Sequence, residues 1–224
     1  TAETIVNGGD YGLLWGYLLS DLTGYTDRDD DRSTAAVMLA TTVAGMSGAG
    51  VLAARRAYSF GDGLVMRSSG YVGMLIGTSI ADIGDPEGSK AYSAGLLAGS
   101  AAGLIVGDRL VAGREFTRGD GVLVQLGGSA GALTGLGVVA LGRPDGPNSS
   151  TAYWFGAAIG GVAGYALTYR QLAGKAAARS SERTSWRFDL APEGMLAAVG
   201  RAPGAGPARA GRPVPAFARL TCTF

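Results

Sequence analysis

The residue types that perform covalent chemistry are sparse in this sequence. The stretch Gly127-Gly128-Ser129-Ala130-Gly131 matches the Gly-x-Ser-x-Gly pattern of serine nucleophiles. Such a serine needs a base, and the 224 residues contain no histidine, which excludes Ser-His-Asp and Cys-His mechanisms and histidine metal sites. Cys222 is the single cysteine, so no internal disulfide or Cys-x-x-Cys pair forms. We therefore predict no catalytic residue and no metal ligand, and expect a protein that is not an enzyme.

The remaining ligand-binding motifs each have a simpler explanation. Residues 48–53 and 135–140 match Gly-x-Gly-x-x-Ala, but neither stretch joins a strand to a helix with an acid downstream, so we predict no cofactor-binding residue and no cofactor. The acidic run at residues 27–31 lacks the glycine and distal glutamate of a calcium loop and fits a solvated loop. The cations of the C-terminal region are spread thinly among few aromatics, which argues against nucleic acid. No small-molecule substrate is identified.

The most informative feature is an internal repeat. Gly61-Asp62-Gly63 recurs as Gly119-Asp120-Gly121, and Gly9-Asp10 is a weaker third copy. An apolar segment, a polar loop and a second apolar segment follow each copy, which defines three units of roughly 55 residues. The sequence begins at Thr1 rather than Met, so we expect an N-terminal piece to precede it. The apolar segments cover 11–20, 34–54, 64–81, 91–107, 122–142 and 150–168.

The spacing of small residues inside these segments favours helices. Residues four apart lie on one helical face, where small side chains let two helix backbones approach closely. A strand interpretation of Val122–Leu126 stays open, and interior glycine costs a helix about 1 kcal/mol. We predict an all-α fold of three tandem αα-hairpins. A shorter small-residue stripe covers positions 36, 40, 44 and 48, and Asp10, Asp62 and Asp120 are predicted helix N-caps. The predicted packing glycines are Gly95, Gly99, Gly103, Gly127, Gly131, Gly135, Gly156, Gly160 and Gly164.

Segment lengths are close to the thickness of a bilayer. Residues 34–54 carry no charge over 21 positions, or about 31 Å of helix against a hydrocarbon core of ~30 Å. Five segments qualify as candidate spans, whereas 11–20 is too short to cross alone. Charged residues make up 17% of the chain against a usual ~25%, and mean hydropathy is +0.20. The modest mean hydropathy favours the alternative, a soluble or surface-associated array of helical hairpins, whereas segments that are apolar on every face favour lipid. We expect a membrane protein.

Acidic residues are enriched in the loops inside the repeat units, and basic residues are enriched in the junctions between them. Loops inside the units are rich in Asp and Glu, whereas the junctions between units collect Arg55, Arg56, Arg109, Arg114 and Arg118. If the segments cross alternately, all junctions face one side, and the positive-inside bias makes that side the cytoplasm. From about residue 174 the chain becomes basic and rich in Pro, Gly, Ala and Arg. We divide it into a helical domain, 1–173, and an extended tail, 174–224, in which residues 186–190 and those after 215 alternate as strands do.

Residues 91–107, 127–137 and 156–164 resemble the glycine-zipper hairpins of bacterial envelope proteins. The resemblance implies a structural or oligomeric component of the envelope whose partners are itself or other envelope proteins and whose surroundings are a lipid bilayer. We expect a non-enzymatic scaffold located in the membrane or cell envelope. Two alternatives stay open. One is a channel or transporter subunit, for which mid-span polar residues are Gln125, Thr41, Thr42 and Thr134. The other is a secreted or surface protein that polymerises into a fibre or sheath.

Overall fold

In the computed structural model, residues 2–26, 31–84, 89–142, 149–184, 186–190 and 218–222 are described. The chain divides into two compact units, Thr1–Ala177 and Ala178–Phe224, and the last helix crosses the boundary between them. The helices of the described residues are α1 (Ala2–Thr23), α2 (Asp31–Arg55), α3 (Phe60–Ile83), α4 (Ser89–Val111), α5 (Arg118–Gly142) and α6 (Ser149–Thr184), and the strands are β1 (Trp186–Leu190) and β2 (Ala218–Cys222).

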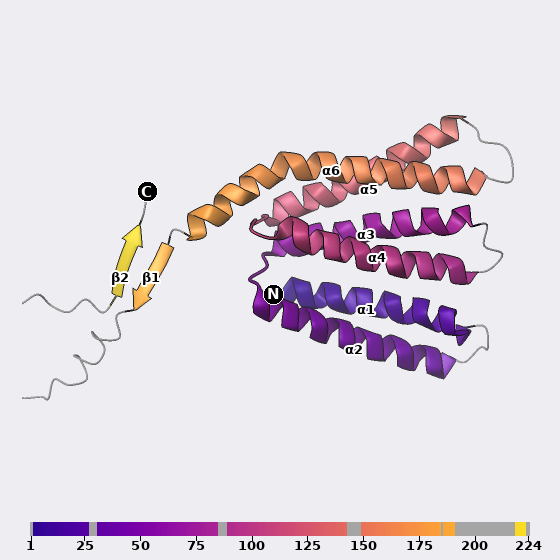
Figure 1. The fold of residues 1–224 in the computed structure, drawn as a ribbon, viewed down its shortest axis with the longest axis horizontal. Helices are drawn as coiled ribbons and strands as arrows, with labels where there is room; N and C mark the ends of the chain where they lie inside the picture. The colour runs from indigo at the N-terminus through magenta and orange to yellow at the C-terminus, as the bar shows by residue number, and fades with distance from the viewer. Residues whose placement is uncertain are drawn as a thin grey trace, which may run out of the picture. The chain divides into compact units, whose positions relative to one another are not determined.

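The first unit consists of three antiparallel helical hairpins, α1 with α2, α3 with α4 and α5 with α6 (Figure 1). Helix α3 lies in the middle, because it contacts α1 and α5 as well as its own partner α4. Residues 56–59 and 112–117 connect successive hairpins at one end of the unit, which we call the junction end. The opposite end is the hairpin end. The predicted all-α fold of three tandem αα-hairpins is confirmed.

Helix α1 is longer than the sequence predicts. The apolar segment covers only 11–20, whereas α1 has 22 residues. The prediction was wrong because polar residues interrupt the apolar pattern, and packing stabilises them: the side-chain amide of Asn7 donates to the carbonyl of Gly63 on α3 at 3.0 Å. The helix ends in a Schellman turn, in which the N–H groups of Gly24 and Tyr25 donate back to the last turn, and the φ of Gly24 is +76°.

The three predicted cap residues do not occupy N-cap positions. Ser59 is the N-cap of α3, and Asp62 lies at the third helical position. The N–H of Asp62 donates to the Ser59 hydroxyl at 3.0 Å and the Asp62 carboxylate accepts the N–H of Ser59 at 2.8 Å, which is a capping box. Thr117 and Asp120 form the same two hydrogen bonds before α5. Asp10 lies inside α1. The spacing alone did not distinguish the N-cap from the third residue.

Helix α6 extends beyond the predicted domain boundary. The sequence predicts an apolar segment over 150–168 and a tail from 174, whereas α6 continues to Thr184. The division between the two units falls after Ala177, within this helix. The polar stretch is helical because Ala, Lys, Arg and Gln, which dominate it, are strong helix formers.

The second unit contains the end of α6 and a two-stranded antiparallel ladder. Trp186 lies opposite Cys222 and Leu190 lies opposite Ala218. Both strands fall in the segments whose alternation predicts strands. The Gly/Pro/Ala/Arg-rich stretch 200–215 lies outside the described residues.

Among the described residues, three helices are long and apolar enough to cross a membrane: Asp31–Arg55, Lys90–Val111 and Arg118–Gly142. At 25 residues, α2 measures about 37 Å, more than the ~30 Å of a bilayer core. The sequence predicts five such segments, including those that form α3 and α6. Polar residues lower the hydropathy of those two helices, and in α3 many of them are buried, for example Ser68, Ser69 and Ser79.

Candidate functional site

Glycine stripes pair the helices within each hairpin. In the α5–α6 hairpin, Gly131 faces Gly160 so closely that a Cβ on either residue would overlap the carbonyl of the other. Gly127 with Gly164 and Gly135 with Gly156 repeat this contact one turn away in each direction. A Cβ added at any of these glycines would come within 3.0 Å of the partner helix.

The helices of the α3–α4 hairpin also pack through facing glycines. Gly99 packs on Gly73, Gly95 packs on Gly77, and Gly103 accepts a hydrogen bond from the Ser69 hydroxyl at 2.8 Å. The sequence prediction named the three α4 glycines but not their α3 partners. Those partners also recur every fourth residue, at 69, 73 and 77, and this spacing was the signal that could have identified them.

In the α1–α2 hairpin the predicted small-residue stripe of α2 does not pack on α1. Positions 36, 40, 44 and 48 are exposed, and a Cβ on Gly48 would meet nothing within 4 Å. The face that packs on α1 instead contains Gly45, which lies against Gly8, and Thr41, which lies against Gly12. Both faces carry small residues at four-residue spacing, so the pattern alone did not select one.

All nine predicted packing glycines lie between helices of the same chain. Close approach of two helix backbones gains dispersion contacts and Cα–H···O interactions, which are the main attractions between helices where no hydrophobic drive exists. The stripes therefore build the hairpins, and the surfaces that remain for other molecules are the outward faces of the helices.

Polar side chains connect neighbouring hairpins near the hairpin end. Asp21 of α1 accepts a hydrogen bond from the Ser93 hydroxyl of α4 at 2.7 Å. Asp82 of α3 accepts hydrogen bonds from Tyr92 of α4 and from Ser150 of α6. Asp21 and Asp82 each lie in the last turn of the first helix of a hairpin, so the same kind of hydrogen bond between hairpins occurs twice. From the sequence alone both aspartates fall at the start of the polar loops inside the repeat units, whereas in the structure both belong to helices.

Aromatic side chains make further links through their polar atoms. Tyr11 of α1 donates to the backbone carbonyl of Arg67 on α3 at 2.8 Å, and the indole of Trp15 donates to the Ser100 hydroxyl of α4 at 2.8 Å. Tyr169 of α6 donates to the carbonyl of Leu110 on α4 at 2.8 Å. These bonds satisfy polar groups inside the unit, where an unpaired group would be costly.

An ion pair lies on the outward face of α1. The Arg67 guanidinium of α3 lies 3.3 Å from the Asp10 carboxylate, and the Asp10 side chain is 50% exposed. Its neighbours along this face of α1 are the exposed apolar residues Val6, Leu13 and Tyr17. Two opposite charges therefore lie within an apolar surface.

A second ion pair joins the connection that follows α2 to α4 at the junction end. Arg56 lies 3.1 Å from Asp108, and the Tyr58 hydroxyl donates to the same carboxylate at 2.6 Å. Burial and this hydrogen bond to a carboxylate raise the pKa of Tyr58 to about 12. The three residues hold the end of α2 against the end of α4.

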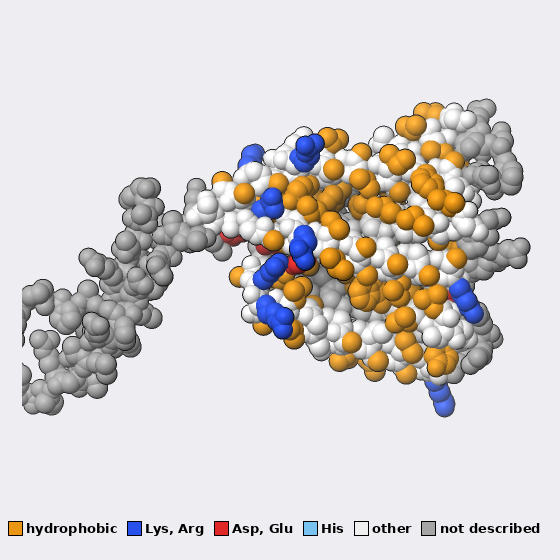
Figure 2. Space-filling view, viewed as in Figure 1, with side chains coloured by type: hydrophobic (Ala, Val, Ile, Leu, Met, Phe, Trp, Pro, Cys, Tyr) orange, Lys and Arg blue, Asp and Glu red, His pale blue; other side chains and the backbone are white. Residues whose placement is uncertain are grey.

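Beside an apolar core that includes Val65, Phe116 and Val124, the described helices expose many large apolar side chains and bury many polar ones. Large apolar side chains cover the outward faces: Leu39 of α2, Ile105 of α4 and Leu141 of α5 are 68%, 64% and 86% exposed. Buried positions include many polar groups, among them Ser20 and Ser100. Figure 2 shows hydrophobic side chains along the helices, with most of the visible Lys and Arg near the junction end. Soluble proteins rarely expose such continuous apolar area.

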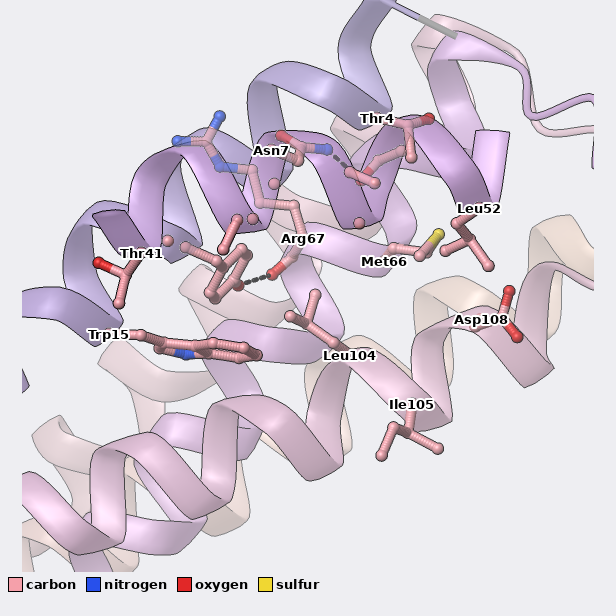
Figure 3. Close-up of a pocket in the computed structure, with 18 of the residues that line it drawn as sticks. Thr4, Asn7, Trp15, Thr41, Leu52, Met66, Arg67, Leu104, Ile105 and Asp108 are labelled. Atoms are coloured by element: carbon pink, nitrogen blue, oxygen red, sulfur yellow. Dashed lines mark hydrogen bonds between the residues drawn. The ribbon is translucent and has the colours of Figure 1, made fainter. Parts of the chain in front are cut away.

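A cavity of about 590 Å³ lies between α2 and α4, with α1 and α3 as its other walls. Figure 3 shows Trp15 and Thr41 toward one end, and Leu52, Thr4 and Asp108 toward the other. Small residues form much of its lining. Its α1 and α2 walls contain Gly8, Gly12, Ala44, Gly45, Gly48 and Ala49.

The remaining sequence motifs lie on regular helices. Residues 127–131 are inside α5, so Ser129 is not on the sharp turn of a serine nucleophile. The Thr41, Thr42 and Thr134 hydroxyls, considered for a channel, each donate to a carbonyl of their own helix. Within the described ranges no cluster of three or more Cys, Asp or Glu side chains could hold a metal ion. Residues 27–30 of the acidic run lie outside those ranges.

No protein-family model, curated protein or solved structure matches this chain.

Proposed function

We propose that this protein is a membrane-embedded, non-enzymatic structural component of the bacterial cell envelope. The observation that carries the proposal is the large number of exposed apolar side chains on the outward faces of three helical hairpins. An 18-residue apolar stretch of α2 contains no buried residue, although the helix is long enough to cross a bilayer. Lipid stabilises such a surface, whereas water does not.

The interior supports the same assignment. Helices that share a bilayer associate through small residues and interhelical hydrogen bonds, because lipid is as apolar as leucine. The backbone contact between Gly131 and Gly160 is an example of packing through small residues. The hydrogen bond from Ser93 to Asp21 is an example of an interhelical hydrogen bond. Glycine weakens isolated helices in water but is more frequent in membrane-spanning helices than in soluble ones, so the glycine-rich helices support a membrane location.

We further propose that a second copy of the chain covers the face that carries Asp10. An exposed charge at this depth in a bilayer is costly, and charged residues in spanning helices nearly always face protein or water. Asp10 is balanced by Arg67, yet half of its side chain stays exposed among Val6, Leu13 and Tyr17. An isologous contact would bring two such ion pairs together and remove both from lipid.

Extraction from membranes tests the proposal. After expression in bacteria, the protein is expected to stay with the membrane pellet through an alkaline carbonate wash, to dissolve in mild detergent, and to float with lipid vesicles after reconstitution. Release by carbonate without detergent would contradict membrane embedding. Material insoluble in detergent but released by acid would instead support a polymer at the cell surface.

A further inference from the structure

We propose that the cavity between α2 and α4 binds one anionic phospholipid, with an acyl chain along α1 and the phosphate at Arg109. This proposal depends on the proposed membrane location. The cavity lies in the apolar surface that would face lipid: exposed Ile105 of α4 and exposed Gly48 of α2 are among its lining residues. An acyl chain could therefore enter sideways from the bilayer.

The walls of the cavity form a polarity gradient along α1. Near the hairpin end the lining residues are Trp15, Leu19 and Thr41, and the Thr41 hydroxyl is already used within its own helix. Near the junction end are Thr4 and Asn7. From Thr4 to Leu19, α1 rises about 22 Å, which exceeds the ~15 Å depth of one leaflet and leaves room for both a chain and the polar part of a lipid.

Two buried polar atoms at this end have no hydrogen-bond partner among the described residues. Thr4 is 4% exposed and Asn7 is 7% exposed, and both the Thr4 hydroxyl and the Asn7 side-chain oxygen are unpaired. Buried polar groups in native proteins are nearly always paired, so each unpaired group needs an explanation. A phospholipid supplies ester carbonyls that accept from a hydroxyl, and a glycerol headgroup supplies hydroxyls that donate to an amide oxygen.

The cationic side chain at the junction end of the cavity favours an anionic ligand. Asp108 lines the cavity, but its charge is matched by Arg56. The guanidinium of Arg67 is paired with Asp10. Arg109 also lines the cavity, and within the described part of the chain it makes no ion pair. A cation at the level of the headgroups attracts anionic lipid by about 1 kcal/mol.

Fluorescence of Trp15 tests the proposal, because this side chain lines the cavity. Substitution of Trp154 and Trp186 by Phe leaves Trp15 as the single reporter. The protein is reconstituted in phosphatidylcholine vesicles that contain a small fraction of lipid with brominated chains, either phosphatidylglycerol or phosphatidylcholine. We expect brominated phosphatidylglycerol to quench Trp15 with about fivefold higher relative affinity.

Two variants and one control define the site. Arg109→Gln is expected to abolish the preference for phosphatidylglycerol, whereas Arg118→Gln removes an exposed cation at the same end that does not line the cavity and is expected to keep it. Gly48→Leu places a side chain in the cavity without a backbone clash and is expected to reduce quenching by both lipids.

The outcomes separate this proposal from the proposed function. Protein that does not float with vesicles would overturn the membrane location itself. Protein that floats but shows equal quenching by both lipids, or an unchanged preference in Arg109→Gln, would overturn the lipid site alone. Absence of quenching by either lipid would also overturn it and would indicate that protein, such as a second copy, fills the cavity.

Discussion

A glycine inside a helix costs about 1 kcal/mol relative to alanine, yet this chain places glycine repeatedly at helix centres. The contacts separate two kinds of position. At Gly131 a Cβ would overlap the backbone of α6, whereas at Gly137 of the same helix it would meet nothing within 4 Å. Only the first kind lets two helix backbones touch, so only the first kind should resist substitution.

Gly131→Ala is therefore expected to destabilise the protein by about 1–3 kcal/mol, the usual cost of overpacking. Gly137→Ala, the matched control, should be neutral or stabilise by up to about 1 kcal/mol through helix propensity. Unfolding of the detergent-solubilised protein, followed by circular dichroism, measures both. Equal effects of the two substitutions would contradict the assigned packing role.

Tyr58 gives the protein a pH dependence at the alkaline end. Its folded-state pKa of about 12 lies above the ordinary value of 10.0, because the phenol is buried and donates to Asp108. A raised pKa means that the neutral phenol stabilises the fold below about pH 10, and that this contribution is lost as the pH rises to 12. We expect wild type to melt above Tyr58→Phe near neutral pH and the two to converge by pH 12. A constant difference across this range would refute the linkage.

At the scale of elements, stability depends on links between successive hairpins. Asp21 and Asp82 occupy equivalent places at the ends of α1 and α3, and each accepts a hydrogen bond from a helix of the following unit. Because hydrogen bonds are directional, these links set the relative position of two hairpins more sharply than apolar contact alone. The sequence repeat is therefore accompanied by a repeat of the hydrogen bonds that connect one hairpin to the next.

Removal of one such link should loosen a whole interface. Ser93→Ala leaves the buried Asp21 carboxylate without this donor, and we expect a loss of about 1–3 kcal/mol. Ser129→Ala changes an exposed serine and is expected to alter stability by less than about 0.5 kcal/mol. Thermal unfolding of the two variants in the same detergent measures the difference. Similar melting temperatures would show that the link contributes little.

For the whole molecule, the glycine stripes pack helices within hairpins, so the proposed contact between two copies depends on the outward faces. The face that carries Asp10 differs from the others because it exposes a charge between Leu13 and Val6. The outward face of α5 around Val138 is apolar and can contact lipid without loss.

Cross-linking distinguishes these faces. Both cysteine variants are made in a Cys222→Ala background and treated with a short bis-maleimide in vesicles. We expect Leu13→Cys to give a covalent dimer. We expect Val138→Cys to stay monomeric, although the Val138 side chain is 65% exposed. Asp10→Asn should weaken the dimer, since one member of the ion pair loses its charge. A dimer through Val138→Cys, or none through Leu13→Cys, would place the interface elsewhere.

The sequence by itself determined the order of the six helices, their pairing into three hairpins and the lack of histidine chemistry. These features are local or periodic: four-residue spacing defines a helical face, and a polar loop defines a hairpin. It did not identify residues 2–10 of α1, where Asn7 is stabilised by Gly63, 56 residues away.

Only the tertiary structure decided which small-residue face of α2 packs on α1, which residue caps α3, and which charges meet. It placed Trp15 against Ser100 and Arg56 against Asp108, residues separated by 85 and 52 positions. It also formed the cavity from four helices. The physical reason is that such contacts depend on the packing of separate helices against one another, and spacing along one helix specifies several equivalent faces without selecting among them.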